Sequence, residues 1–185
     1  MQESFGSNYL KDAVAQFHSL KALADKALAQ VTDAELFVTL DPESNSIAVI
    51  TKHLAGNMLS RWTEFLASDG EKPDRNRDSE FELTPGQTRT ALLARWESGW
   101  LCLFNTIEQL SEEDLSKRVL IRGQEHSVIE AINRQLTHYA CHVGQIVFLA
   151  KHLRSKDWQS LSIPRGKSSE FNAAMSRTQQ PKEKG

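Results

Sequence analysis

Two histidines four positions apart, His138 and His142, lie in the apolar stretch "QLTHYACHVGQIVFLAKHL", residues 135–153. Residues at positions i and i+4 share one face of an α-helix, with Cβ atoms roughly 5–6 Å apart. Two imidazole nitrogens at that spacing can bind one metal ion at about 2.0–2.1 Å each. The HExxH pattern of metalloproteases is excluded, because Tyr139 stands where that pattern has its glutamate base. The pair alone is also compatible with two hydrogen-bonded core histidines.

A third imidazole would favour metal binding over a structural role for the pair. His53 is the best candidate, because it lies near the middle of a second apolar stretch, on one face with Ile50 and Asn57. Three neutral histidines and a water form an open site of the catalytic type rather than a closed structural one. The other histidines are expected to face solvent or lie at helix ends. They are His18, His126 and His152.

Four polar residues are candidates for supporting the histidines or contacting a substrate. Asn57 and Gln145 each lie about one turn from a candidate ligand and could hydrogen-bond to it, but an amide cannot serve as a base. Glu97 is the one carboxylate that the helical pattern places near the core, although a solvated rim position is more common for glutamate. Arg61 is the fourth candidate. The sequence therefore offers no convincing general base.

Arginines gather at the end of the second apolar stretch and in the charged segment after it. Arg61, Arg75 and Arg77 could form a rim that holds a carboxylate-bearing thiol cofactor or substrate. The favoured alternative is a solvated and self-paired run of charges. Its acidic members are Asp74, Asp78 and Glu80.

The cysteines and tryptophans have simpler interpretations. Cys141 lies between the two histidines but 100° round the helix from each, so it is expected to be a small buried residue and not a ligand. With Cys102 as the only other cysteine and no CxxC pair, reduced thiols in a cytoplasmic protein are expected. Tryptophans at helical spacing could line a pocket but are more often core. They are Trp62, Trp96 and Trp100.

Apolar residues recur every three or four positions in four long segments, which predicts four helices. They run at about residues 7–31, 46–67, 88–110 and 127–154. Ser44 or Asn45 is expected to cap the second helix, and Ser127 with Glu130 matches a capping box at the start of the fourth. Four long amphipathic helices of this kind predict an all-α four-helix bundle. It forms a single domain over residues 1–185, with its core at about 7–175 and a frayed tail at 176–185.

Shorter features separate the helices. The charged stretch "SDGEKPDRNRDSEFE" predicts a long loop, and loops of that length are often functional. The stretch "KRVLIRGQEHS" predicts a small hairpin-like excursion around Arg122 and Gly123. A short C-terminal helix is expected within "SSEFNAAMSR", residues 168–177.

Composition bounds the function. The chain has 185 residues, 39% of them hydrophobic and 25% charged, with a formal net charge of -2. Nothing in this balance favours nucleic acid or an anionic membrane as a partner. No apolar run reaches the roughly 20 residues of a membrane span, and no secretory signal is visible. A cytoplasmic protein that acts on a small molecule is the expectation.

The stretches "SIAVITKHLAGNMLSRW" and "LTHYACHVGQIVFLAKHL" together resemble the DinB / YfiT-like superfamily. The resemblance covers roughly residues 7–175 and rests on the HxxxHxxQ motif of His138, His142 and Gln145 with "KHLAGN" upstream. It implies a four-helix bundle in up-down-down-up order. It also implies a divalent metal, zinc or nickel, bound by His53, His138 and His142.

The resemblance implies several activities. Some members of the superfamily resemble thiol-dependent enzymes: S-transferases that use bacillithiol, and an isomerase that uses mycothiol. Others are described as metal-dependent hydrolases. The favoured hypothesis is a metal-dependent transferase or hydrolase for small molecules, with an activated water or a low-molecular-weight thiol as nucleophile. The alternatives are a non-enzymatic bundle stabilised by metal, or an interaction module that uses loop 69–83. A homodimer is a further expectation.

Overall fold

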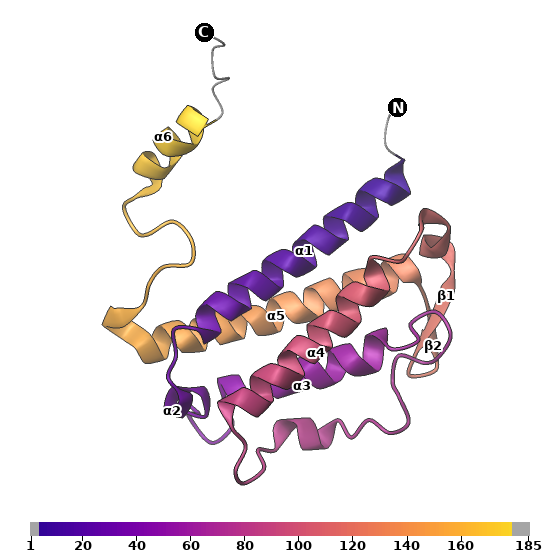
Figure 1. Ribbon diagram of the computed structural model, residues 1–185, viewed down its shortest axis with the longest axis horizontal. Coiled ribbons are helices and arrows are strands. Elements are labelled where there is room, and N and C mark those ends of the chain that lie inside the picture. Colours follow the sequence, from indigo (N-terminus) through magenta and orange to yellow (C-terminus); the bar gives the residue numbers. More distant parts are fainter. Residues whose placement is uncertain (1–3, 179–185) are drawn as a thin grey trace.

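Figure 1 shows the computed structural model of the protein, which describes residues 4–178. The described chain is mostly helical, as the sequence predicts. Its long helices are α1 (Phe5–Leu28), α3 (Ile47–Trp62), α4 (Arg89–Ile107) and α5 (Val128–Arg154). The shorter elements are α2 (Asp33–Leu36), α6 (Ser168–Thr178), β1 (Arg118–Ile121) and β2 (Gln124–Ser127).

The four long helices enclose one core. α3 packs along α4 and also contacts α5, while α1 packs along α5 and also contacts α4. Trp62, Trp96 and Trp100 are at most 1% exposed, so they are core residues rather than the lining of an open pocket. Trp62 Nε1 donates to Tyr139 Oη at 3.1 Å, and Phe17 meets Trp62 edge-on. These contacts join α1, α3 and α5 at the centre of the fold.

α3 is shorter than its apolar pattern predicts. Ser46, not Ser44 or Asn45, is its N-cap, and the Ser46 side chain accepts from the backbone N–H of Val49 at 3.3 Å. The helix stops at Trp62 instead of residue 67, because Thr63 is extended and Glu64 has a φ of 48°. A left-handed residue ends a right-handed helix. Apolar residues beyond that point still contribute to the core, although the chain there is no longer helical.

α5 carries both histidines of the HxxxH pair and matches its predicted bounds. Ser127 and Glu130 form the predicted capping box, with Glu130 N donating to Ser127 Oγ at 3.2 Å and Ser127 N donating to Glu130 Oε2 at 2.6 Å. At 1.5 Å per residue the helix is roughly 40 Å long. With 27 residues it is the longest helix of the described chain.

The predicted hairpin is confirmed. β1 and β2 pair antiparallel, and the turn between them places Arg122 and Gly123 at φ values of 55° and 72°. Two successive positive φ values give the tight turn that matches strand twist. The backbone N–H groups of Arg122 and Gly123 donate to the carboxylate of Asp69 at 2.9 and 2.7 Å. The hairpin turn therefore holds the start of the long charged loop.

The charged loop between α3 and α4 has structure of its own. It contains a 3-10 turn at Asp78–Phe81 that packs against α3. Lys52 of α3 donates to the backbone carbonyls of Ser79 and Glu82 at 2.6 and 2.5 Å. These bonds fix the turn on α3, one residue away from His53 along the helix.

The C-terminal helix α6 lies apart from the long helices in Figure 1. It covers residues 176–178 of the predicted frayed tail, and residues 179–185 lie outside the described part of the chain. Within the part described, no helix has both the length and the apolar character needed to cross a membrane.

Candidate metal centre

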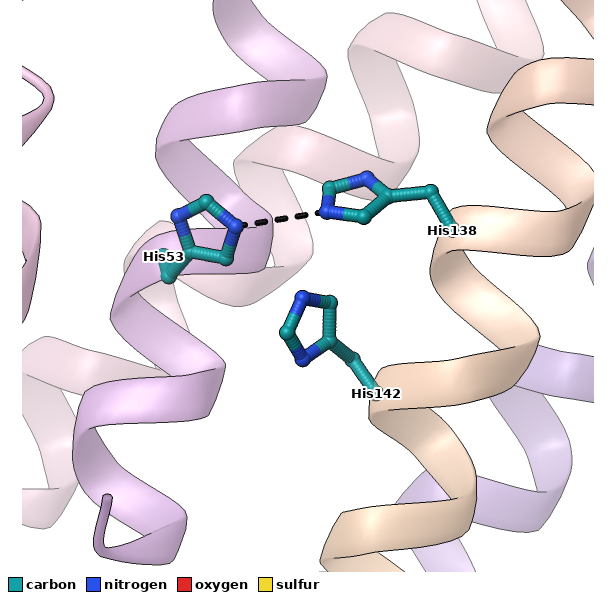
Figure 2. A group of neighbouring side chains, drawn as sticks. All are labelled: His53, His138 and His142. Atoms are coloured by element: carbon teal, nitrogen blue, oxygen red, sulfur yellow. Dashed lines mark hydrogen bonds between the residues drawn. The ribbon is translucent and has the colours of Figure 1, made fainter. Parts of the chain in front are cut away.

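Three histidines converge between α3 and α5 (Figure 2). One ligand nitrogen from each of His53, His138 and His142 lies within 4.8 Å of the others. The Nε2 atoms of His53 and His138 are 3.3 Å apart. Two nitrogens bound tetrahedrally at about 2.0–2.1 Å from one ion are separated by about 3.3 Å. This pair therefore already has the spacing that a shared ion requires.

The three rings differ in burial. His53 is 4% exposed, whereas His138 and His142 are half-buried at the edge of α5 that faces α3. The sequence pattern predicts that both α5 histidines point into the core, but the core side of α5 is formed by Gln135, Tyr139 and Val143. The histidine cluster lies beside the core, where a small molecule can approach it.

The tautomer of His53 is fixed by a carboxylate. His53 Nδ1 lies 2.9 Å from Glu80 Oε2. An ionised carboxylate only accepts hydrogen bonds, so Nδ1 carries the proton and the lone pair of Nε2 faces the centre. Such a carboxylate behind a ligand histidine also raises the basicity of the ring.

Glu80 is held in turn by Arg75. The Nε and Nη2 atoms of Arg75 donate to the two oxygens of Glu80, both at 2.8 Å, and Arg75 Nη1 donates to Glu71 at 3.0 Å. Burial by itself raises the pKa of Glu80, but the hydrogen bonds from His53 and Arg75 outweigh it and hold that pKa below its usual value. The Glu80 carboxylate is therefore ionised at neutral pH.

Gly56 makes room for that carboxylate. A Cβ atom at Gly56 would lie 2.8 Å from the Cδ carbon of Glu80, too close for any real contact. Gly56 is three residues after His53 and shares its helix face. The carboxylate reaches His53 because this position has no side chain.

The tautomer of His142 is fixed within its own helix. His142 Nδ1 lies 2.8 Å from Gln145 Oε1, an amide oxygen that accepts. Nδ1 therefore carries the proton, and Nε2 is left with a free lone pair. In Figure 2 one ring nitrogen of His142 faces the space between His53 and His138.

Both α5 histidines are neutral in the metal-free protein. Burial, followed by the neighbouring His142 and His53, lowers the pKa of His138 to about 3. Burial also lowers the pKa of His142. Because a metal ligand must be an unprotonated imidazole, protons do not compete with a metal for these nitrogens at neutral pH.

Three of the four polar residues singled out from the sequence do lie at the centre. Gln145 contacts His142, while Asn57 and Arg61 line a pocket with His53 and His138. The Oδ1 atom of Asn57 accepts from Tyr139 Oη at 3.0 Å, which fixes the amide. Asn57 and Gln145 thus lie close to the histidines with which their helix spacing groups them.

The predicted placement of Glu97 near the core is wrong. Its side chain is 61% exposed on α4 and pairs with Lys21 of α1 at 2.9 Å. The face of α4 that carries Glu97 borders α1, while the buried face carries Trp96 and Trp100. The carboxylate at the histidines is Glu80, which the sequence grouped with the solvated charges. In the sequence, the one sign of this role is that Glu80 lies in a long loop together with Arg75.

Cys141 is exposed rather than buried, because its side of α5 faces solvent. It lines a second pocket with Gln145 and Phe148, on the other side of the histidines from Arg61. Of the three loop-end arginines, Arg75 is paired as the favoured alternative predicts, but its side chain is 5% exposed and therefore not solvated. Arg61 and Arg77 also line the pocket at His53.

The remaining histidines have separate roles. His18 stacks on Phe104 and pairs with Glu108 at 3.5 Å with its side chain 55% exposed. His152 is exposed in the last turn of α5, and His126 is half-buried in β2. Within the described chain, none of the three belongs to the cluster formed by His53, His138 and His142.

Comparison with known proteins adds one finding. No curated protein matches the sequence. A family model matches residues 4–167, a range that includes the four long helices, the hairpin, the charged loop and the three clustered histidines. The chain belongs to the family described as "Protein of unknown function (DUF1572)".

Proposed function

We propose that this protein binds a divalent metal, zinc or nickel, through His53, His138 and His142, and uses it as an enzyme acting on small molecules. The observation that carries the proposal is the 3.3 Å separation of the two Nε2 atoms, with Nδ1 of His53 occupied by Glu80. Three neutral imidazoles suit zinc and nickel better than calcium or magnesium, which prefer oxygen ligands.

We further infer the DinB-like up-down-down-up bundle for the four long helices. α1 and α5 run in one direction in Figure 1, and α3 and α4 run in the other. The charged loop supplies the long return that two successive parallel helices need. The "KHLAGN" and HxxxHxxQ stretches, which resemble that superfamily, supply the three histidines.

The bound ion would supply Lewis-acid chemistry, lowering the pKa of a water or thiol and polarising a substrate oxygen. The chain's own residues hold its ligands. Glu80 and Gln145 keep the Nδ1 protons of His53 and His142 on the outer side of the rings, which orients both Nε2 atoms inward. Glu80 is not a free base, because Arg75 and His53 occupy its two oxygens. A thiol substrate or cofactor could supply the nucleophile itself.

An enzyme is preferred to a metal-stabilised bundle because the centre is open. A pocket of about 460 Å³ is lined by His53 and His138, within the size range of small-molecule sites. A purely structural site would have its fourth ligand from the protein. An interaction module is disfavoured, since it gives no reason for three imidazole nitrogens from two helices to converge within 4.8 Å. The homodimer and the cytoplasmic location stay predictions.

The test is elemental analysis of untagged protein, with His142→Ala and the exposed control His18→Ala. About one equivalent of zinc or nickel is expected in the wild type and in His18→Ala. Its loss is expected in His142→Ala. Metal-loaded protein would then be screened for thiol transfer and hydrolysis. Wild-type protein that neither contains a metal nor takes one up on incubation would contradict the proposal.

A further inference from the structure

The pocket beside the histidines is lined by five arginines. They come from α3, the charged loop, the hairpin turn and α5, so four separate parts of the chain direct guanidinium groups to one place. No aspartate or glutamate of the described chain is among its lining residues. The arginines are Arg61, Arg75, Arg77, Arg122 and Arg134.

The carboxylates behind the pocket do not balance these charges. Among the five arginines, Glu80 pairs with Arg75, and Asp78 lies 4.0 Å from Arg77. A single carboxylate, Glu71, serves three guanidinium groups at 3.0 to 3.6 Å. These three carboxylates thus pair with four of the five arginines, and a fourth carboxylate, Asp69, also acts on Arg61, so the arginines outnumber the carboxylates by one before any metal is added. The three groups that share Glu71 belong to Arg61, Arg75 and Arg122.

Arg61 is the most deeply placed of the five. It is 4% exposed, and its nearest carboxylate lies 3.6 Å from Nη2, longer than a hydrogen bond. Within residues 4–178, neither Nε nor Nη1 has a hydrogen-bond acceptor. Gly70 allows this burial, because a Cβ there would lie 2.6 Å from Nη1. A buried cation without a full set of acceptors is costly, so such a side chain is typical of a binding site.

The pocket also has neutral donors beside the guanidinium groups. The two amide side chains that line it, Asn57 and Gln135, are at most 5% exposed. Guanidinium forks match the two oxygens of a carboxylate or phosphate in a bidentate way. Because His53 and His138 line the same pocket, an anion bound there lies next to the metal centre.

We propose that this arginine pocket binds the carboxylate or phosphate of the substrate and thereby places the reacting part of that molecule at the metal. The proposal rests on the proposed function in treating the bound molecule as a substrate. The anion site itself is formed by protein side chains and needs no metal. It identifies the substrate class as a small oxyanion, and it excludes neutral and cationic molecules.

The experiment is calorimetric titration of inorganic phosphate and of succinate into metal-free and zinc-loaded protein at low ionic strength. The variant is the double substitution Arg122→Gln with Arg134→Gln. Arg134 is exposed, the Arg122 side chain is 54% exposed, and so neither change disturbs the core. Arg118→Gln is the matched control, because Arg118 is 65% exposed on the same hairpin and lies outside the pocket.

At least one anion is expected to bind the metal-free wild type, and the affinity should fall about tenfold in the double variant. The affinity of the control should stay within about twofold of the wild type, since Arg118 pairs with Glu130 at 3.9 Å, and its removal takes no side chain from the pocket. Tighter binding of phosphate than of succinate would indicate that the substrate carries a phosphate group. Tighter binding of succinate would indicate a carboxylate.

Two results would overturn the proposal. One is binding that requires zinc and is unchanged in the double variant, which makes the anion a ligand of the metal alone. The other is no binding to either form. Anion binding by a protein that takes up no metal would instead support the pocket and contradict the metal proposal, so the two failures are distinguishable.

Discussion

Two of the three clustered histidines, His53 and His142, are held in different ways. His53 is buried and donates to Glu80, a charged residue 27 positions later that Arg75 fixes from behind. His142 is half-buried and donates to Gln145, a neutral and exposed residue three positions later in the same helix. A charge-assisted bond in a buried site is stronger than a neutral bond at the surface. We call the Glu80 carboxylate the support of His53 and the Gln145 amide the support of His142. The support of His53 should therefore contribute more to metal affinity and to folding than the support of His142 does.

The largest expected effect follows from Glu80→Ala. It removes the acceptor of His53 and leaves Arg75 buried without its main partner. Breaking a buried pair from one side costs about 3–5 kcal/mol of unfolding free energy, and losing a ligand's carboxylate costs about 10–100-fold in metal affinity. Urea unfolding of metal-free protein and zinc competition with a chromogenic chelator measure the two effects. The control is Glu97→Ala, which breaks an exposed pair and should cost under about 1 kcal/mol.

Gly56→Ala should weaken the same support without removing any charge. The new methyl group displaces Glu80 from His53, because the space at this position is already filled by the carboxylate. We expect zinc affinity to fall about tenfold. Gly144→Ala in α5 is the matched control, since a Cβ there meets nothing within 4 Å. Equal zinc affinities for the two variants would show that Glu80 does not position His53.

Acid should act on the cluster through His138, the third histidine. Its pKa is about 3 in the folded protein against about 6.5 in an unfolded chain. Between these values the unfolded chain binds more protons, so stability is complete above pH 6.5 and falls as the pH decreases towards 3. The lowered pKa of Glu80 acts in the same direction at lower pH.

With the partial exposure of the ring taken into account, the loss in metal-free protein between pH 7 and pH 5 should be about 1 kcal/mol. Urea unfolding at several pH values measures it, and His138→Asn should flatten the curve. The exposed control His152→Asn should leave the slope unchanged. A slope that persists in His138→Asn would place the titrating group elsewhere.

Gln145→Ala should have the smallest effect. Its bond to His142 is neutral and exposed, so zinc affinity is expected to fall only about two- to fivefold, with little change in unfolding free energy. Gln16→Ala on the surface of α1 is the control for the substitution itself. A loss as large as that of Glu80→Ala would reverse the ranking of the two supports.

The same contrast explains what the sequence could predict. The support of His142 is local, so the HxxxHxxQ spacing places Gln145 beside it on one helix. The four long helices, the capping box at Ser127 and the hairpin turn at Arg122 and Gly123 are local in the same sense. Each depends on residues a few positions apart, and each is found near its predicted place.

The support of His53 could not be predicted in that way. Glu80 reaches the ring because α3 ends early at Trp62, the loop folds back, and Gly56 leaves a space. None of these follows from helical periodicity, since the apolar pattern continues past Trp62 into Phe65. Glu97 was the carboxylate that periodicity placed near the core, but the packing of α4 on α1 turns it towards Lys21.

The hairpin turn has a consequence for the histidine cluster, although it is a surface feature. An unbroken series of contacts joins the turn to the imidazole of His53, passing through side chains and backbone of the charged loop. In mechanical terms the series resembles a truss, in which a stiff turn supports an imidazole that it never touches. A change in the length of the turn would therefore be transmitted to the ring. The members in order are Gly123, Asp69, Glu71, Arg75, Glu80 and His53.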